Sequence, residues 1–206
     1  MIEKYFPFTR EQLALIEKFY EMHANAGLNL TAIKNREDFY QKHVLDSFLL
    51  YTVKTETLGV NIADVGTGGG FPGMILAIMY PDKKFTLIDS IAKKCRFLEE
   101  AVKELGLKNV RVITSRSEDI KGKIFDTILT RGVAKVDQII KYTWNLAGDN
   151  CVWVLYKGEN VADEIKAAEK TLKTKRLEYI NVRYDEPIQR TYTLLSRGSA
   201  GGRLHG

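Results

Sequence analysis

The sequence lacks the features that would place it among membrane proteins, secreted proteins or metalloproteins. None of its apolar runs approaches the roughly 20 residues that cross a bilayer. Its N-terminus, MIEKYFPFTREQ, mixes charges with aromatics and contains no apolar signal-peptide core. Cys95 and Cys151 are the two cysteines, and they show neither metal-ligand spacing nor the number needed for a disulfide framework. We therefore expect a cytoplasmic protein with no membrane anchor and no metal site.

What is present describes an ordinary globular chain with a modest basic excess. The 206 residues suit one domain with a small N-terminal addition, and 45% hydrophobic residues are enough to bury a core. The net charge is +5 and the pI is about 9.0. Such an excess fits a solubilising surface, and it fits equally a polyanion partner whose phosphates the cations would contact.

The first part of the chain is predicted to be helical. Thr9 to Gln12 match a capping box, and apolar residues then recur at helical spacing up to Tyr20. Residues 25–35, NAGLNLTAIKN, interrupt the pattern, and a second helix is expected over about 36–52. We predict three parts: a helical extension packed on the core (1–58), the main domain (59–197) and a Gly-rich disordered tail (198–206).

From residue 60 onward short strands alternate with helices. The expected strands are rich in β-branched residues and are VNIADV, FTLID, VRVIT, DTILT and CVWVLY. The clearest helix lies between Ser90 as N-cap and Gly106 just past its end. This alternation predicts an α/β protein, with a Rossmann-like parallel sheet covered by helices.

The last two expected strands differ from the others. Residues 176–184 and 191–196 are separated by DEPIQR alone, which is too short for a parallel crossover. The sheet is therefore predicted to be mostly parallel and to end in a C-terminal antiparallel hairpin.

A glycine-rich loop, DVGTGGGFPG, follows the first expected strand. Gly68, Gly70 and Gly73 satisfy the dinucleotide pattern G-x-G-x-x-G, which alone is weak because the loop is dense in glycine. Asp89 ends the second strand, 23 residues after Gly66, where a carboxylate accepts both ribose hydroxyls of an adenosine cofactor. These residues favour an adenosine ligand without choosing one.

Three residues of the loop argue against a pyrophosphate. Pro72 removes an N–H donor, Phe71 adds bulk, and Asp64 places a negative charge near the loop. The charge would repel a phosphate and attract the cations of S-adenosylmethionine. A nicotinamide-dependent oxidoreductase remains the alternative enzyme, and a tight turn without a ligand remains the structural alternative.

Several stretches, taken in order and spacing, resemble the bacterial RsmG (GidB) family of 16S ribosomal RNA methyltransferases. They are LNLTAI, KHVLDSFLL, IADVGTGGGFPG, FTLIDS, KKCRFLEEAVKELGLKNV and SRSEDI, within about residues 28 to 160. The resemblance implies a class I methyltransferase fold with S-adenosylmethionine as cofactor. It also implies transfer of a methyl group to N7 of a guanine in the decoding-region loop of 16S rRNA, so 16S rRNA or the small ribosomal subunit is the expected partner of a monomeric enzyme.

The glycine loop and the resemblance together give a set of candidate cofactor residues. These are Asp64, Gly66, Gly68, Gly70, Phe71, Asp89, Ser117, Glu118 and Arg131. Arg131 has two possible jobs, holding the methionine carboxylate or contacting RNA, and a structural salt bridge is the alternative. The stretch TRGVAKV departs from the family's usual Ala-Arg-Ala-Val/Phe-Ala run, so Gly132 makes that loop less predictable.

The absence of an obvious base or nucleophile agrees with methylation at guanine N7, whose lone pair needs no general base. The chain has no Asn/Asp-Pro-Pro-aromatic loop for amino-group methylation, and neither cysteine follows a proline. A non-catalytic RNA-binding factor with the same fold would show the same absence and stays open. The candidate RNA contacts are His43, Lys93, Arg96, Lys135 and Lys157.

Overall fold

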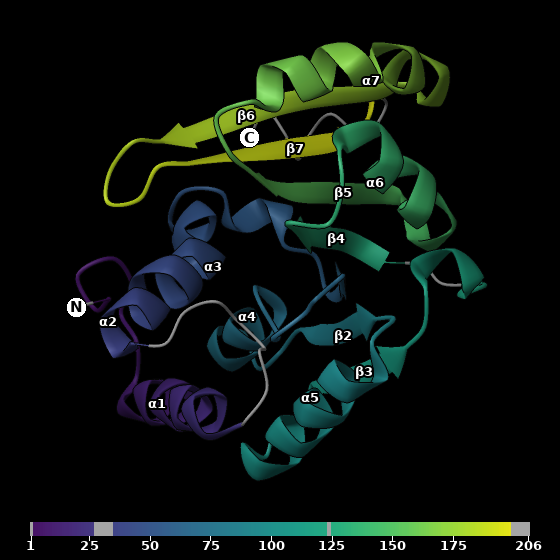
Figure 1. Cartoon of the computed structure of the whole chain (residues 1–206). Helices are drawn as coiled ribbons and strands as arrows, with labels where there is room; N and C mark the ends of the chain where they lie inside the picture. The colour runs from purple at the N-terminus through teal and green to yellow at the C-terminus, as the bar shows by residue number, and fades with distance from the viewer. Residues whose placement is uncertain (1, 27–34, 123–124, 199–206) are drawn as a thin grey trace.

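The computed structural model describes residues 2–26, 35–122 and 125–198 and is built around one seven-stranded sheet (Figure 1). The strand order is β3-β2-β1-β4-β5-β7-β6. The strands are β1 (Asn61–Val65), β2 (Lys84–Asp89), β3 (Val110–Thr114), β4 (Phe125–Arg131), β5 (Ala147–Lys157), β6 (Leu177–Tyr184) and β7 (Arg190–Arg197). All five strands expected between residues 60 and 156 are present, and β5 begins four residues earlier than predicted.

The pairing of the strands confirms the predicted topology. β1 pairs with β2 and β4, β2 with β3, and β4 with β5, all in parallel. β7 pairs antiparallel with both β5 and β6. The short connection between β6 and β7 forces this reversal, because a parallel return would need a crossover of a dozen or more residues.

Helices cover both faces of the sheet (Figure 1). One face packs against α1 (Arg10–Asn25), α2 (Arg36–Phe39), α3 (Asp46–Phe48), α4 (Gly73–Met79) and α5 (Ala92–Glu104). The other face packs against α6 (Val136–Thr143) and α7 (Val161–Lys175). Among the described residues, no helix has the length and apolar character needed to cross a membrane.

Local capping follows the sequence at one helix and departs from it at another. Thr9 and Gln12 form the predicted capping box of α1, and Gly106, with φ +66°, follows α5 as predicted. The prediction that Ser90 caps α5 was wrong. The cap position is Ile91, whose N–H donates to Asp89 Oδ1 at 2.9 Å, so Asp89 satisfies the donor that precedes the helix.

The expected helix over 36–52 is helical throughout but changes its hydrogen bonding. A π-helical segment, Tyr40–Leu45, lies between α2 and α3, and a 3₁₀ turn, Leu49–Thr52, ends the run. The expected break at 25–35 and the predicted tail fall largely outside the described residues.

The N-terminal helices share one hydrophobic core with the sheet. Phe19 of α1 and Phe39 of α2 belong to the same buried cluster as Phe71 and Leu98. The Phe19 ring lies 5.5 Å from that of Phe71, and the Phe39 ring lies 5.4 Å from it. The division into a 1–58 extension and a 59–197 domain remains a prediction, since these parts pack as one body.

Gly70 is the point where the glycine loop meets this core. Its φ is +95°, and a Cβ placed there would lie 2.8 Å from Leu98 Cδ2, 2.8 Å from Met74 Cγ and 3.1 Å from Phe19 Cζ. Glycine at this position therefore lets the loop approach the protein's own side chains closely.

We predict that Gly70→Ala lowers the free energy of unfolding by about 2 to 4 kcal/mol, the sum of a left-handed backbone penalty and overpacking. Urea unfolding measures the change. Gly158→Ala is the matched control, because nothing lies within 4 Å of a Cβ there and its φ is not in the left-handed region. Equal stability of the two variants would contradict the proposed packing.

Candidate active site

A cleft of about 210 Å³ opens where the carboxyl ends of β1, β2 and β3 meet the loops that follow them. The strand order reverses between β1 and β4, and open α/β sheets bind ligands outside the carboxyl ends at such a point. The cleft is lined by Val65, Gly66, Ile88, Asp89, Ser90, Ser115, Arg116, Ser117, Glu118, Val133 and Tyr142. Ligand sites usually measure roughly 300–1,000 Å³, so this cleft matches a part of a cofactor, such as its nucleoside.

Asp89 joins the glycine loop to the end of β2. Its Oδ2 accepts the Gly68 N–H and its Oδ1 accepts the Ile91 N–H, both at 2.9 Å. The residue is 8% exposed and lines the cleft. Each carboxylate oxygen has two lone pairs, so both can accept a further hydroxyl proton.

Asp64 lies deeper, under the loop. Its Oδ2 accepts from Thr67 Oγ1 at 2.7 Å and from the Gly73 N–H at 2.9 Å. Its Oδ1 is buried without a partner among the described residues. Burial raises the pKa of Asp64 to about 6, because desolvation disfavours the carboxylate. Asp64 therefore fixes the shape of the loop, and its contact with a cofactor remains a prediction.

The structure separates the remaining candidate cofactor residues into two groups. Gly66, Ser117 and Glu118 line the cleft with Asp89, and Ser117 Oγ donates to Glu118 Oε2 at 2.9 Å. Phe71 does not line it. Its ring is 2% exposed and stacks on the His43 imidazole, with centroids 4.3 Å apart and planes at 9°. Phe71 thus packs within the protein, and its contact with a cofactor remains a prediction.

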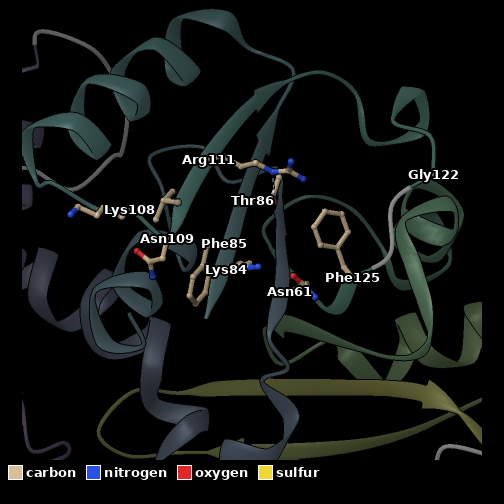
Figure 2. A pocket seen from close by; sticks show the side chains of 10 residues that line it. Asn61, Lys84, Phe85, Thr86, Lys108, Asn109, Arg111, Gly122 and Phe125 are labelled. Atoms are coloured by element: carbon tan, nitrogen blue, oxygen red, sulfur yellow. Dashed lines mark hydrogen bonds between the residues drawn. The ribbon is translucent and has the colours of Figure 1, made fainter. Parts of the chain in front are cut away.

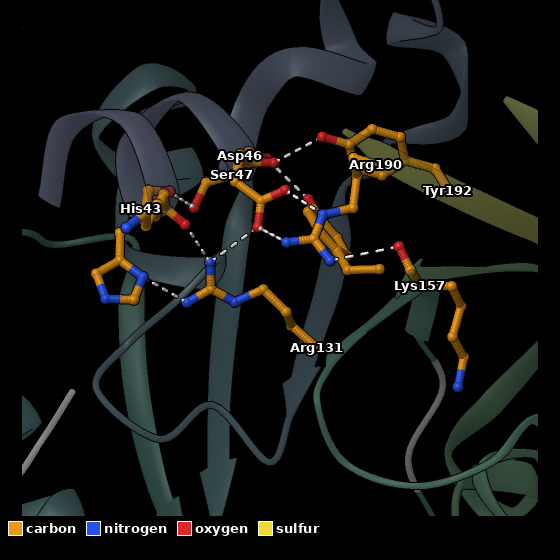
Figure 3. A network of polar contacts seen from close by, with 9 residues as sticks. His43, Asp46, Ser47, Arg131, Lys157, Arg190 and Tyr192 are labelled. Carbon is orange, nitrogen blue, oxygen red and sulfur yellow. Dashed lines mark hydrogen bonds and ion pairs between the residues drawn. The ribbon is translucent and has the colours of Figure 1, made fainter. Parts of the chain in front are cut away.

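Arg131, at the end of β4, belongs to a buried polar network (Figure 3). Its Nη1 donates to Asp46 Oδ2 at 3.1 Å and to the Lys42 carbonyl oxygen at 3.2 Å. Arg190 approaches the same carboxylate, with Nε 2.6 Å from Oδ1 and Nη2 2.8 Å from Oδ2. Asp46 has no exposed surface, so the two guanidinium groups compensate a fully buried charge.

His43 completes the environment of Arg131. The Nη2 of Arg131 lies 2.8 Å from His43 Nδ1, so the imidazole accepts at that nitrogen. Burial lowers the pKa of His43 to about 3, and the positive charge of Arg131 adds to this effect. His43 is therefore neutral at physiological pH and acts as an acceptor for Arg131.

Sequence reasoning missed Arg190 and Tyr192, which reach the N-terminal segment from β7. Tyr192 Oη donates to the Asp46 carbonyl oxygen at 2.9 Å. In the sequence Arg190 closes a polar turn and gives no sign of a buried partner 144 residues away. Val133 and Tyr142 of the cleft were also missed, since they look like ordinary loop and helix residues.

The candidate RNA contacts differ in their exposure to solvent. Lys93, Arg96 and Lys135 are exposed, as an RNA contact requires. Lys157 is buried, and its Nζ donates to the Ala134 carbonyl oxygen and to Glu164 Oε2, each at 2.7 Å. This placement assigns Lys157 to an internal ion pair, and we no longer count it among the RNA contacts.

The cleft can bind and orient a ligand, and its lining contains no cysteine and no histidine. Both cysteines are buried, and Cys95 Sγ donates to the Asp89 carbonyl oxygen at 3.4 Å. Covalent catalysis by a thiol therefore has no support at this site. The chemistry that fits is a displacement between two bound partners that depends on alignment.

Solved structures similar to this chain share its fold. MtNAS, in a structure with S-adenosylmethionine, superposes with a TM-score of 0.63 at 12% identity, covering 91% of this chain and 72% of that one. A SAM-dependent methyltransferase from Aquifex aeolicus gives a TM-score of 0.58 at 16% identity, covering 87% and 96%. Together with the mixed sheet, these likenesses establish the class I methyltransferase fold.

Sequence relatives are closer. The ribosomal RNA small subunit methyltransferase G of Carboxydothermus hydrogenoformans is 38% identical over 184 residues, covering 85% of this chain and 77% of the relative. The protein of the same name from Chlorobium limicola is 36% identical over 169 residues, covering 78% and 77%. The family model described as rRNA small subunit methyltransferase G matches residues 12–191. The chain therefore belongs to the GidB family of rRNA small subunit methyltransferases G.

Proposed function

We propose that this protein transfers a methyl group from S-adenosylmethionine to N7 of a guanine in the decoding-region loop of 16S rRNA. The observation that carries the proposal is the cleft at the carboxyl ends of the parallel strands, with Asp89 on its lining, in a chain of this family. The acceptor nitrogen has a free lone pair, so the transfer that we propose needs no general base.

The residues present fit S-adenosylmethionine. Asp89 keeps acceptor capacity for two ribose hydroxyls, while Gly66, Ser117 and Glu118 surround the same cleft. The unpartnered Oδ1 of Asp64 offers a negative atom beneath the loop, where an ammonium would be favoured. When bound, this cofactor supplies an electrophilic methyl group on a sulfonium. The protein's part is to orient the donor and acceptor and to exclude water.

Arg131 is the side chain best placed to act on the second substrate or on the cofactor's carboxylate. Its contacts with Asp46, Lys42 and His43 occupy Nη1 and one hydrogen of Nη2, so Nε–H and one Nη2 hydrogen stay available. The side chain is 17% exposed, and its orientation is fixed from behind by the buried carboxylate. We assign the free donors to RNA or to the methionine carboxylate.

The compartment and the partner follow from the proposed substrate. A protein that modifies 16S rRNA works in the cytoplasm, on free rRNA or on the small subunit. Its basic excess suits a phosphate-rich partner, and Lys93, Arg96 and Lys135 are the exposed cations that we propose for contact with it. We propose that it acts as a monomer.

We expect the protein, incubated with labelled S-adenosylmethionine and unmodified 30S subunits, to place one methyl group on a decoding-region guanine. Mass mapping of 16S rRNA with and without the protein measures the modification and its position. A bound but unlabelled RNA would instead favour a non-catalytic RNA-binding factor. Stabilisation by NADH and not by S-adenosylhomocysteine in thermal unfolding would favour an oxidoreductase.

We predict that Asp89→Ala weakens cofactor binding by about 100-fold or more, because a hydrogen bond to a charged group contributes about 1.5 to 3 kcal/mol and two are lost. Isothermal titration with S-adenosylhomocysteine measures the change, and a melting curve checks that the fold is kept. Asp163→Ala, which removes an exposed carboxylate on α7, is the control and should bind S-adenosylhomocysteine normally. Unchanged affinity of Asp89→Ala would show that the ribose assignment is wrong.

We predict that Arg131→Lys lowers kcat/KM for methyl transfer by about 100-fold, the usual cost of losing an oriented donor at a reacting site. An ammonium cannot reproduce the planar fork that Asp46 and His43 hold. Arg190→Lys is the control, since it also loses a two-point contact with Asp46 but lies on β7. We expect Arg190→Lys to lower the melting temperature while kcat/KM changes little.

The cofactor Kd of Arg131→Lys then decides between the two jobs. A raised Kd assigns Arg131 to the methionine carboxylate, and an unchanged Kd with a raised KM for 30S subunits assigns it to RNA. If kcat/KM falls no further in Arg131→Lys than in Arg190→Lys, Arg131 is structural.

A further inference from the structure

A second cleft, of about 500 Å³, lies on the sheet away from the candidate active site. Figure 2 shows Asn61, Lys84, Thr86 and Arg111 along neighbouring strands, with Gly122 and Phe125 on one side and Lys108 on the other. Lys84 and Asn61 begin β2 and β1, so the cleft occupies the amino-terminal half of the strands. No residue of the candidate active site lines it.

The cleft exists because the connection from β3 to β4 leaves part of the sheet uncovered. In its described part this connection contains a single 3₁₀ turn, Ser117–Asp119, where a crossover usually carries a helix. Every residue of β3 is consequently partly or fully exposed. Alternation along β2 places Phe85 and Leu87 in the core shared with α4 and α5, and it turns Lys84 and Thr86 to the other face.

The charge of this face has one sign. Lys84, Lys108 and Arg111 are exposed, and no lining residue is acidic. Among the residues that the structure describes, none of the three forms an ion pair. Arg111 uses Nε to donate to Thr86 Oγ1 at 2.9 Å, which orients the guanidinium and leaves its Nη donors for a ligand.

Few acidic side chains lie near the cleft. They either accept backbone hydrogen bonds or lie on the 3₁₀ turn outside the cleft lining. Asp126 contacts the lining residue Asn61, and its Oδ2 accepts the N–H groups of Val60 and Asn61 at 3.1 and 2.8 Å. Glu118 and Asp119 are exposed on the 3₁₀ turn Ser117–Asp119, where Glu118 lines the active-site cleft and neither residue lines this one. They would repel a phosphate at the turn, so the favourable phosphate positions are at the amino-terminal half of β2 and β3.

We propose that this cationic cleft, defined by Lys84, Lys108 and Arg111, holds backbone phosphates of the ribosomal RNA substrate outside the target loop. The proposal rests on the proposed function for the identity of the RNA. Phe125 and Phe85 are buried, so the cleft offers no aromatic surface for base stacking and contacts the backbone without reading sequence.

The distance to the active site suits one continuous RNA. Ser115 of the active-site cleft follows Arg111 by four positions along and just past β3, which is about 13 Å at 3.3 Å per residue. Cations in the second cleft would therefore anchor RNA whose neighbouring nucleotides extend toward the methyl-transfer site. These cations would raise the affinity for RNA and would leave methyl transfer to the guanine unchanged.

The test compares Lys84→Ala/Arg111→Ala with Lys166→Ala/Lys170→Ala, which removes two exposed cations from α7. Binding to unmodified 30S subunits is measured by filter retention at several salt concentrations, separately from methyl transfer. We expect the cleft variant to bind about tenfold more weakly, and its log–log salt slope to fall by about 1.4 to 1.8, since two phosphate contacts are lost and each contributes about 0.7 to 0.9. The α7 variant should match the unsubstituted protein.

Two further measurements make the result specific. The single variant Arg111→Lys keeps the charge and should retain the salt slope, and the affinity for S-adenosylhomocysteine should be equal in all variants. Equal 30S binding and equal salt slopes for the cleft and α7 variants would overturn the proposal. A protein that binds 30S subunits through the cleft but transfers no methyl group would overturn the proposed function and leave the cleft assignment standing.

Discussion

The buried carboxylate of Asp46 is the interaction on which the arrangement of the active site depends. It has no exposed surface and takes two guanidinium groups, Arg131 from β4 and Arg190 from β7. Removing either cation would leave a buried charge undercompensated, which costs about 3–5 kcal/mol in measured cases. The Asp46 carboxylate thus connects the N-terminal segment with the centre of the sheet and with the antiparallel hairpin.

This arrangement gives the N-terminal helices a part in the site that they do not enter directly. His43 and Asp46, both from that segment, contact Arg131 from the side of the core. His43 also stacks on Phe71, a residue of the glycine loop. Two of the elements that surround the proposed reaction centre therefore take their positions from the same helical run.

The glycine loop shows how one motif can serve two purposes. Gly66 lines the cleft and Gly68 gives its N–H to Asp89, while Gly70 accommodates side chains of α1, α4 and α5. A ligand pattern alone would assign all of these glycines to the cofactor. The structure gives these glycines different surroundings, so part of the glycine density serves the packing of the loop on the helices.

Local patterns predicted most of the sheet and placed Gly66, Asp89, Ser117 and Glu118 at one cleft. β-branched runs located the strands, and the short connection between β6 and β7 fixed the antiparallel reversal. Asp89 followed from its place at the end of β2. Contacts between distant segments were not predictable, because no periodicity links Asp46 to Arg131 or to Arg190. Ser90 was misassigned as the cap of α5 because Asp89, one residue earlier, accepts the N–H of Ile91 at the cap position.

The separation of Asp46 from its partners constrains the order in which the chain folds. The two ion pairs close over 85 and 144 residues, and contacts of such high sequence separation form slowly because chain entropy must be lost first. Until β7 is in place, dehydrating Asp46 beside Arg131 alone is costly, so the N-terminal helices cannot settle permanently before the C-terminal hairpin. The N-terminal helices, although they precede the sheet in the chain, thus take their final position together with the C-terminal hairpin.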